Sequence, residues 1–193
     1  MIGTVQIGAD GTPRCWWCGN DAEYVRYHDE EWGRPLHGEA KVLEKLCLEG
    51  AQAGLSWITI LRKRPRYREV FQEFDPYAVA RFAETDVERL MGDVGIVRNR
   101  AKITAAIDNA RATVRMLDAG DSLDALCWSF APPARSRRLS AAESMVASTV
   151  ESAAMSRELK RRGFRFVGPT TMHAFMQSAG MVDDHIEGCW VPQ

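Results

Sequence analysis

Apolar residues recur along most of this chain at the three- and four-residue spacing that is typical of amphipathic helices. The clearest example covers residues 39–53, where one stripe is formed by Val42, Leu43, Leu46, Cys47 and Gly50. Strict alternation of apolar and polar residues, the pattern of a half-buried strand, is scarce. The segment FRFVG at 164–168 is the only one that fits it. The pattern therefore predicts an all-α protein.

Further helices are predicted on both sides of this central one. Asn20 and Glu23 have the spacing of a capping box, which would open a helix that runs to about Trp32 and ends at the GRP stretch. Pro76 follows Asp75 and is well placed as the first residue of another helix. Residues 56–63 either continue the central helix or begin a new one. The other predicted helices cover residues 85–93, 98–117, 122–130, 148–162 and 170–179.

The length of 193 residues suits one domain or two closely fused lobes. We expect residues 1–12 to form a flexible leader, because they are rich in Gly and lack periodicity, and residues 13–193 to form a single compact domain of two helical lobes. Residues 134–147 are the least regular part and are interpreted as a surface excursion. The net charge of −1 means that any nucleic-acid site is a local basic patch rather than a property of the whole surface.

The five cysteines are widely spread and odd in number, which is not the pattern of a disulfide framework. The N-terminus has no basic segment followed by an apolar stretch, and no apolar run approaches the length of a membrane span. We therefore expect a soluble protein in a reducing cytoplasm.

Two potential metal ligands lie four residues apart close to the C-terminus, His185 and Cys189. Cys15 and His28, near the other end, are candidates for the remaining ligands of a tetrahedral zinc site. Four protein ligands would make the site structural, and a metal bound by both ends would act as a clasp. Two alternatives stay open: Cys18 competes as a ligand, or the histidine is a surface residue and the cysteine merely buried.

Glu49 is an anomaly in the central helix. On a helical wheel it falls at the edge of the apolar stripe, whereas Lys41, Glu44 and Lys45 fall on the solvent side. A buried carboxylate costs free energy unless it is paired. It is therefore either a boundary residue that reaches water or a functional group on the core face.

Aromatic residues are dense around the first predicted helix. Tyr24 and Tyr27 share one face of this helix, and Trp57 follows Glu49 by eight residues. The tryptophans that flank the helix are Trp16, Trp17 and Trp32. Such a cluster is usually core, but aromatic rings around one carboxylate also bind a flat, positively charged ring.

The stretch DVERLMGDVGIVRNRAKI places two glycines before a helix with a basic start. Backbone N–H groups reached through a glycine turn bind phosphate well, and basic side chains add charge. The residues concerned are Gly92, Gly95, Arg98, Arg100 and Lys102. The alternative is an ordinary helix connection with solvated charges.

Taken together, several long stretches resemble the 3-methyladenine DNA glycosylase I family. They are RCWW, EYVRYHDEEWGRP, LCLEGAQAGLSWITILRKR, FDPYAVA, DVERLMGDVGIVRNRAKI, CWSF, LKRRGFRFVGPTT and DDHIEGC, in order over roughly residues 13–190. The resemblance implies an all-α helix-hairpin-helix glycosylase fold with a structural zinc clasp that joins the N- and C-terminal segments. It also implies a monomer that hydrolyses the N-glycosidic bond of flipped 3-methyladenine in alkylated double-stranded DNA, as part of base excision repair.

The resemblance also assigns roles in base binding, zinc binding and DNA binding to particular residues. Glu49 matches the glutamate that contacts the flipped base. The family's zinc ligands match Cys15, His28, His185 and Cys189, and its aromatic pocket matches Tyr24, Tyr27 and Trp57, with Trp17 and Trp32. The segment from Gly92 to Lys102 resembles the DNA-binding hairpin. Cys18 and His37 are additional potential metal ligands.

Two other classes of protein have to be distinguished from a glycosylase. One is a non-catalytic, zinc-stapled module that binds damaged DNA, and the other is a zinc-dependent hydrolase.

Overall fold

The computed structural model describes residues 4–192, and helices account for most of this part of the chain. The helices are α1 (Ala22–Glu30), α2 (Glu39–Gln52), α3 (Trp57–Val70), α4 (Pro76–Ala80), α5 (Glu84–Met91), α6 (Arg100–Asp118), α7 (Leu123–Trp128), α8 (Val150–Arg161) and α9 (Pro169–Ser178). Two short 3₁₀ helices, η1 (Trp16–Cys18) and η2 (Gln72–Phe74), complete the helical part. The prediction of a mainly helical protein is confirmed.

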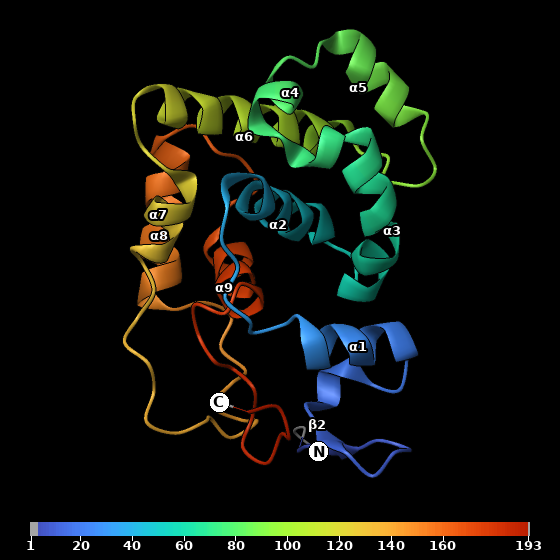
Figure 1. Ribbon diagram of the computed structural model, residues 1–193, viewed down its shortest axis with the longest axis vertical. Helices are drawn as coiled ribbons and strands as arrows, with labels where there is room; N and C mark the ends of the chain where they lie inside the picture. Colours follow the sequence, from blue (N-terminus) through green and yellow to red (C-terminus); the bar gives the residue numbers. More distant parts are fainter. Residues whose placement is uncertain (1–3, 193) are drawn as a thin grey trace.

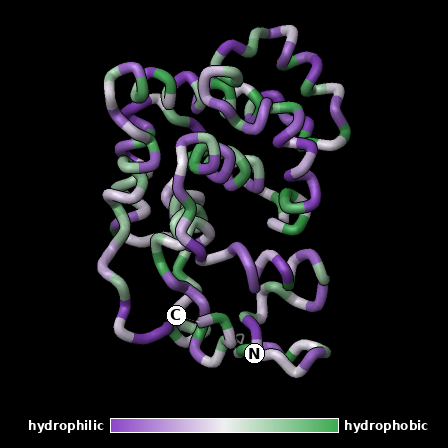
Figure 2. The backbone as a smooth tube through the Cα atoms, in the orientation of Figure 1, coloured by the Kyte–Doolittle hydropathy of each residue, from purple (hydrophilic) through white to green (hydrophobic). Residues whose placement is uncertain are grey.

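Helix α2 lies at the centre of the bundle, where it contacts α3, α6, α7 and α9 (Figure 1). The apolar stripe predicted for residues 39–53 accounts for this position, because Val42, Leu43 and Leu46 are almost completely buried. In Figure 2 hydrophobic and hydrophilic segments alternate around the helical turns, as expected for helices that present one face to a shared core. Helices α8 and α9 form an adjoining pair.

The central helix is buried more completely than the wheel predicts. Glu44 and Lys45, which we expected on the solvent side, are only 9% and 4% exposed. Their charges are paired: Arg68 of α3 donates to Glu44 at 2.9 Å, and Lys45 donates to Glu31 at 3.1 Å. The wheel fails here because it cannot show that α3 and the end of α1 cover this face and supply opposite charges.

Two further expectations about local structure are wrong. The α1 helix is capped by Asp21, whose carboxylate accepts hydrogen bonds from the backbone N–H groups of Glu23 and Tyr24, and not by Asn20. The segment 164–168 is not a strand. Phe166 has a left-handed backbone (φ 56°), which breaks the extended geometry, although its neighbours Phe164 and Val167 are buried as core residues.

Of the two short strands that form, one lies in the predicted leader and the other directly follows it. Residues Gln6–Ile7 (β1) pair with Pro13–Arg14 (β2) as an antiparallel ribbon, and Arg14 joins the turn to α1 through ion pairs with Asp10 and Asp29. Part of the expected flexible leader is therefore a hairpin; residues 1–3 lie outside the described residues.

Both ends of the described chain lie at the same end of the molecule, beside α1 (Figure 1). Trp190 donates its backbone N–H to the carbonyl of Pro13 at 2.9 Å, and its indole N–H to Asp29 at 3.1 Å. The C-terminal segment thus packs against the β2–α1 region. None of the described helices combines the length and the apolar character needed to span a membrane.

Candidate active site

A cavity of about 410 Å³ lies between α1, α2, α3 and α9. Its aromatic lining consists of Trp16, Trp17, Tyr24, Tyr27, Trp32 and Trp57. Its polar lining includes Glu49, Gln52, Gln177, Ser178 and Asp184. The structure therefore brings together the carboxylate and all five aromatic residues that the sequence indicated as substrate-binding. A cavity of this size holds a purine-sized ring.

Glu49 occupies the wall formed by α2 and is 5% exposed. The hydroxyl of Ser178, at the end of α9, donates a hydrogen bond to its Oε1 at 2.8 Å. Burial raises the pKa of Glu49 to about 7, while the nearby charge of Lys45 and the bond from Ser178 act in the opposite direction. The carboxyl group therefore changes charge close to neutral pH, which is unusual for glutamate and typical of functional sites.

The aromatic residues that line the cavity form a continuous wall of contacting rings. The rings of Trp17 and Trp32 meet edge to face with centroids 4.9 Å apart, and Tyr27 and Trp57 lie 5.5 Å apart. Tyr24 extends the wall, 5.2 Å from Trp17. The indole N–H of Trp57 is buried and has no hydrogen-bond partner among the described residues. A bound ring would thus meet aromatic faces together with the carboxylate of Glu49.

Lys45 is a charged group near the site that sequence reasoning placed in solvent. Its ammonium lies 5.2 Å from the ring centres of both Tyr27 and Trp57 and is paired with Glu31. It does not line the cavity. Its contribution is electrostatic, because a buried positive charge behind the aromatic wall favours the ionised form of Glu49.

Gln177 and Asp184 form a second polar group in the cavity that the sequence did not indicate. Gln177 Nε2 donates to Asp184 at 2.7 Å, and Arg135 pairs with the same carboxylate. Because a carboxylate only accepts hydrogen bonds, it fixes the orientation of the Gln177 amide. No local pattern distinguishes these residues, since they meet only when α9 and the C-terminal segment pack together.

The irregular segment predicted at 134–147 contributes to the rim of the cavity. It contains no helix or strand, as expected, and its residues Ser144–Ala147 line the opening. Met145 and Val146 are 60% and 48% exposed, which is high for large apolar side chains beside a cavity. The excursion thus contributes exposed apolar side chains to the lining of the cavity.

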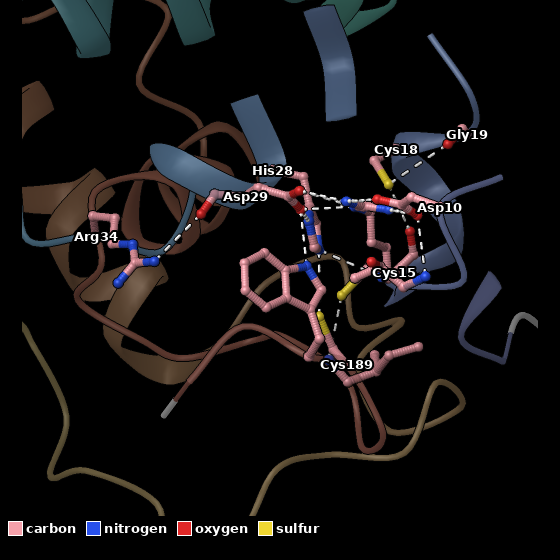
Figure 3. Close-up of polar contacts among 12 residues, drawn as sticks. Asp10, Cys15, Cys18, Gly19, His28, Asp29, Arg34 and Cys189 are labelled. Carbon is pink, nitrogen blue, oxygen red and sulfur yellow. Dashed lines mark hydrogen bonds and ion pairs between the residues drawn. The ribbon is translucent and has the colours of Figure 1, made fainter. Parts of the chain in front are cut away.

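Figure 3 shows a separate cluster of potential metal ligands. It lies beside the aromatic wall, because the rings of Trp17 and His28 are 5.3 Å apart. The candidate ligand atoms of Cys15, His28 and Cys189 all lie within 4.8 Å of one another, and all three residues are buried. Cys189 Sγ is 3.5 Å from His28 Nε2. Ligand atoms of a tetrahedral zinc ion are separated by about 3.5 Å, given metal–ligand distances of about 2.0–2.3 Å. The spacing of these atoms therefore suits a zinc ion.

His185 is the fourth predicted ligand. Its ring lies 5.1 Å from that of His28, and its Nε2 is buried without a hydrogen-bond partner among residues 4–192. Both histidines have their other nitrogen, Nδ1, beside a carboxylate: Asp29 at 2.7 Å from His28 and Asp183 at 3.0 Å from His185. Carboxylates commonly orient metal-binding histidines in this way. His185 is not part of the group of ligand atoms that lie within 4.8 Å of one another, so the structure brings three of the four predicted ligands together and places the fourth beside them.

The two thiols of the cluster differ in their tendency to ionise, because the hydrogen bond to Cys189 and burial raise the pKa of Cys15 far above that of an ordinary thiol. A hydrogen bond from Cys15 holds the pKa of Cys189 well below that of an ordinary thiol, so this pair shares one thiolate even without a cation. The two competing candidates for metal binding, Cys18 and His37, are not part of this group of ligand atoms. Cys18 Sγ faces the carbonyl of Cys15 at 3.1 Å, and His37 pairs with Asp124 and stacks on Trp128.

The predicted hairpin connects α5 and α6 at residues 92–99. It is anchored to α3: Lys63 donates to the carbonyl of Val94 at 2.7 Å, and the Tyr67 hydroxyl accepts from Val97 N–H at 3.1 Å. Gly95 packs closely against Arg66, where an added Cβ would lie 2.5 Å from its Cγ, so a larger residue would displace this side chain. Since α3 begins at Trp57, the hairpin and the cavity share one rigid support.

The basic residues of the hairpin are not equivalent. Arg98 is exposed and has no hydrogen bond or ion pair with any described residue, whereas Arg100 pairs with Glu84 and Glu88. Lys102 donates to the carbonyls of Ala51 and Ala53 at 2.8 and 2.6 Å. The geometry leaves Arg98 with an unengaged charge and makes Lys102 a cap on the C-terminal end of α2.

Comparison with known proteins places the chain in a family. Residues 17–192 match the methyladenine glycosylase family. The chain is 48% identical over 178 residues to the DNA-3-methyladenine glycosylase 1 of Escherichia coli K12, covering 91% of this chain and 95% of that protein. It is 45% identical over 187 residues to the DNA-3-methyladenine glycosylase of Haemophilus influenzae, covering 92% and 97%. The chain therefore belongs to the methyladenine glycosylase family.

Solved structures extend the comparison to the fold. A crystal structure of 3-methyladenine DNA glycosylase I superposes with a TM-score of 0.89 at 46% identity, covering 93% of this chain and 100% of the other. A structure of the Staphylococcus aureus glycosylase, described as the basis of its 3-methyladenine recognition, gives 0.86 at 33% identity and covers 99% of both chains. The fold is that of this family over nearly the whole length.

The raised pKa of Glu49 predicts a pH-dependent stability difference between the wild type and Glu49→Gln. The folded-state pKa of about 7 exceeds the ordinary value of 4.5, so ionisation of the buried group opposes folding. This free-energy cost of ionising Glu49 is absent below about pH 4.5 and fully present above about pH 7. Glutamine never ionises, so the variant does not have this cost. We expect the variant to gain roughly 1–3 kcal/mol relative to wild type across this interval.

Thermal unfolding of both proteins from pH 5 to pH 8 measures this difference. The titration of all other groups is common to the two proteins and cancels. A difference in melting temperature that stays constant over the whole range would show that Glu49 titrates normally and is not buried in the charged form.

Proposed function

We propose that this protein is a DNA-3-methyladenine glycosylase, a monofunctional hydrolase of base excision repair that acts on alkylated double-stranded DNA. The observation that carries the proposal is the buried carboxylate of Glu49 facing an aromatic cavity of purine size. Membership of the methyladenine glycosylase family supports the same activity. The proposal includes action as a monomer, as the family resemblance implies.

The cavity suits a positively charged purine. A glycosylase must take its target base out of the duplex to reach the glycosidic bond. Methylation at N3 makes adenine cationic, and a cationic ring is attracted both by aromatic faces and by a carboxylate. Tyr24, Tyr27 and Trp57 provide the faces, and Glu49 provides the charge.

The chemistry needs little acid–base assistance, because the base is already a good leaving group. The bond between C1′ of the sugar and the base breaks, its electron pair stays on the base, and the base leaves neutral. Water adds to C1′ and releases a proton to solvent. Glu49 stabilises the positive charge as the bond breaks. We expect no lyase step; Lys45 does not line the cavity and is paired with Glu31.

Chromatographic analysis of the free bases released from methylated DNA tests this function. We expect release of 3-methyladenine with little 7-methylguanine, and we expect Glu49→Gln to retain the fold but reduce release at least tenfold. Binding to methylated DNA without release of any base, by a protein shown to be folded, would instead identify a non-catalytic damage-binding module.

We further propose that Cys15, His28, His185 and Cys189 bind a structural zinc ion. The support is the cluster of ligand atoms, the unpartnered Nε2 of His185 and the carboxylates behind both histidines. Four protein ligands leave no open position for catalysis, which argues against a zinc-dependent hydrolase. The ion would join the residues before α1 to the C-terminal segment and stabilise both.

Substitution of one ligand tests the zinc site. Cys189→Ala is expected to lose stoichiometric zinc and to unfold at a markedly lower temperature, because metal binding and folding are coupled. Cys18→Ala is the matched control, since Cys18 is equally buried but faces backbone carbonyls. Elemental analysis of the purified proteins gives the metal content. Retention of zinc by Cys189→Ala together with its loss in Cys18→Ala would reassign the ligand.

We also propose that the α5–α6 hairpin binds the DNA backbone, with Arg98 as its unengaged positive charge. Arg98→Ala is expected to weaken binding to damaged and undamaged duplexes alike and to lower the dependence of log K on log salt by about one. Arg157→Ala removes an equally exposed arginine from α8, away from the hairpin, and serves as the control (Figure 1). Fluorescence anisotropy at several salt concentrations measures both effects. Weaker binding to damaged DNA alone would mean that Arg98 contacts the lesion.

A further inference from the structure

Ser178 lies at the C-terminal end of α9, where it is 3% exposed and faces α2. Its hydroxyl is within hydrogen-bonding distance of two acceptors, Oε1 of Glu49 at 2.8 Å and the backbone carbonyl of Phe175 at 3.2 Å. A serine hydroxyl has one proton and can donate to only one acceptor at a time. The carbonyl of Phe175 also accepts the backbone N–H of Ala179. We therefore consider the shorter contact, between the hydroxyl and the carboxylate of Glu49, as the hydrogen bond that Ser178 makes.

The groups around Glu49 include no other hydrogen-bond donor to it among the described residues. From α1, the rings of Tyr24 and Tyr27 face the cavity, and burial keeps both hydroxyls protonated by raising their pKa values. From α2, the ammonium of Lys45 is nearby but donates to Glu31. From α3, Trp57 is uncharged. From the C-terminal segment, Asp184 lines the same cavity and is paired with Arg135.

We propose that Ser178 is a positioning residue that holds Oε1 of Glu49 and thereby leaves Oε2 as the acceptor for the flipped base. This inference rests on the proposed function, because it assigns a role in base binding. The carboxylate has one oxygen hydrogen-bonded to the protein and the other without a partner among the described residues, so a ligand in the cavity meets an oriented acceptor rather than a rotating group.

The same hydroxyl can accommodate both protonation states of Glu49. When the carboxylate is charged, Ser178 donates to Oε1. When Glu49 is protonated, its own proton can be donated to Ser178 Oγ, while the serine proton turns to the carbonyl of Phe175. The side chain of Glu49 therefore has a partner in each state and keeps its position when it loses or gains a proton.

Removal of the hydroxyl has a predictable electrostatic effect. The bond from Ser178 favours the charged form of Glu49, whereas burial opposes it. Without this bond the pKa of Glu49 must rise further above its ordinary value. The fraction of enzyme with an ionised carboxylate then falls at neutral pH but recovers when the pH is high enough.

The pH dependence of kcat/KM for release of 3-methyladenine from methylated DNA tests this inference, because it reports ionisation in the free enzyme. We expect the acid limb of Ser178→Ala to shift upward by about half a pH unit or more relative to wild type. The loss of activity should therefore be about threefold or more at low pH and small at high pH. Ser178→Thr retains the hydroxyl and should restore the wild-type midpoint.

Ser156→Ala is the matched control. Ser156 is also a buried helical serine, but its hydroxyl donates to the carbonyl of Val167 and not to a residue of the cavity. Its midpoint should equal that of wild type. An unchanged midpoint in Ser178→Ala, or an equal loss of activity at every pH, would overturn the inference and leave Ser178 with a packing role only.

A measurement without DNA separates this inference from the proposed function. Titration of ¹³C-labelled glutamate carboxyl groups by NMR, with Glu49→Gln to assign the resonance, gives the pKa of Glu49 directly. A higher pKa in Ser178→Ala than in wild type supports the inference even if the protein releases no base. Equal values in the two proteins contradict it even if base release is normal.

Discussion

The burial of one ionisable carboxyl group, that of Glu49, is the constraint on which the rest of this structure depends. A charged group in a protein interior is unfavourable unless charges and hydrogen bonds compensate for the lost water. Here the compensation comes from four helices: Lys45 provides a positive charge on α2 itself, Ser178 donates from α9, and aromatic rings of α1 and α3 enclose the space. Of the helices that contact α2, α3 and α9 contribute side chains to the cavity, and α1 adds its two tyrosines.

The aromatic wall connects the cavity to the cluster of potential metal ligands. Trp32 lines the cavity, and its ring centre lies 4.6 Å from that of His185. Trp17 also lines the cavity and lies 5.3 Å from His28. The same rings thus contact the cavity on one side and the cysteine–histidine cluster on the other. A clasp at this point would hold the two ends of the chain and also fix the position of the wall against which the base would stack.

Much of the fold could be predicted from the sequence because helices of this length are recognised from the local spacing of their apolar residues. The limits of α2 were predicted to within one residue, and Pro76 was correctly predicted to begin a helix. The predictions that were wrong concern residues whose environment is set by partners distant in the chain. Lys45 was predicted in solvent because the covering charge of Glu31 is invisible on a helical wheel.

The same distinction applies to the site. Glu49 was identified because a carboxylate on an apolar stripe is a local anomaly, and the aromatic cluster was identified because it is dense in sequence. Ser178, Gln177 and Asp184 carry no such signal, since a serine, an amide and an acidic residue near a helix end are ordinary. Their roles arise only from tertiary packing that brings α9 and the C-terminal segment to the cavity.

The central claim is that a methylated adenine binds in this cavity against the charge of Glu49. Calorimetric titration with free 3-methyladenine, comparing the wild type with Glu49→Gln at slightly alkaline pH, tests it most directly. The account predicts saturable binding to the wild type, with the negative heat-capacity change of ring burial, and at least tenfold weaker binding to the variant. Equal affinities for the two proteins would contradict the account, because the base would then bind without contact to the carboxylate.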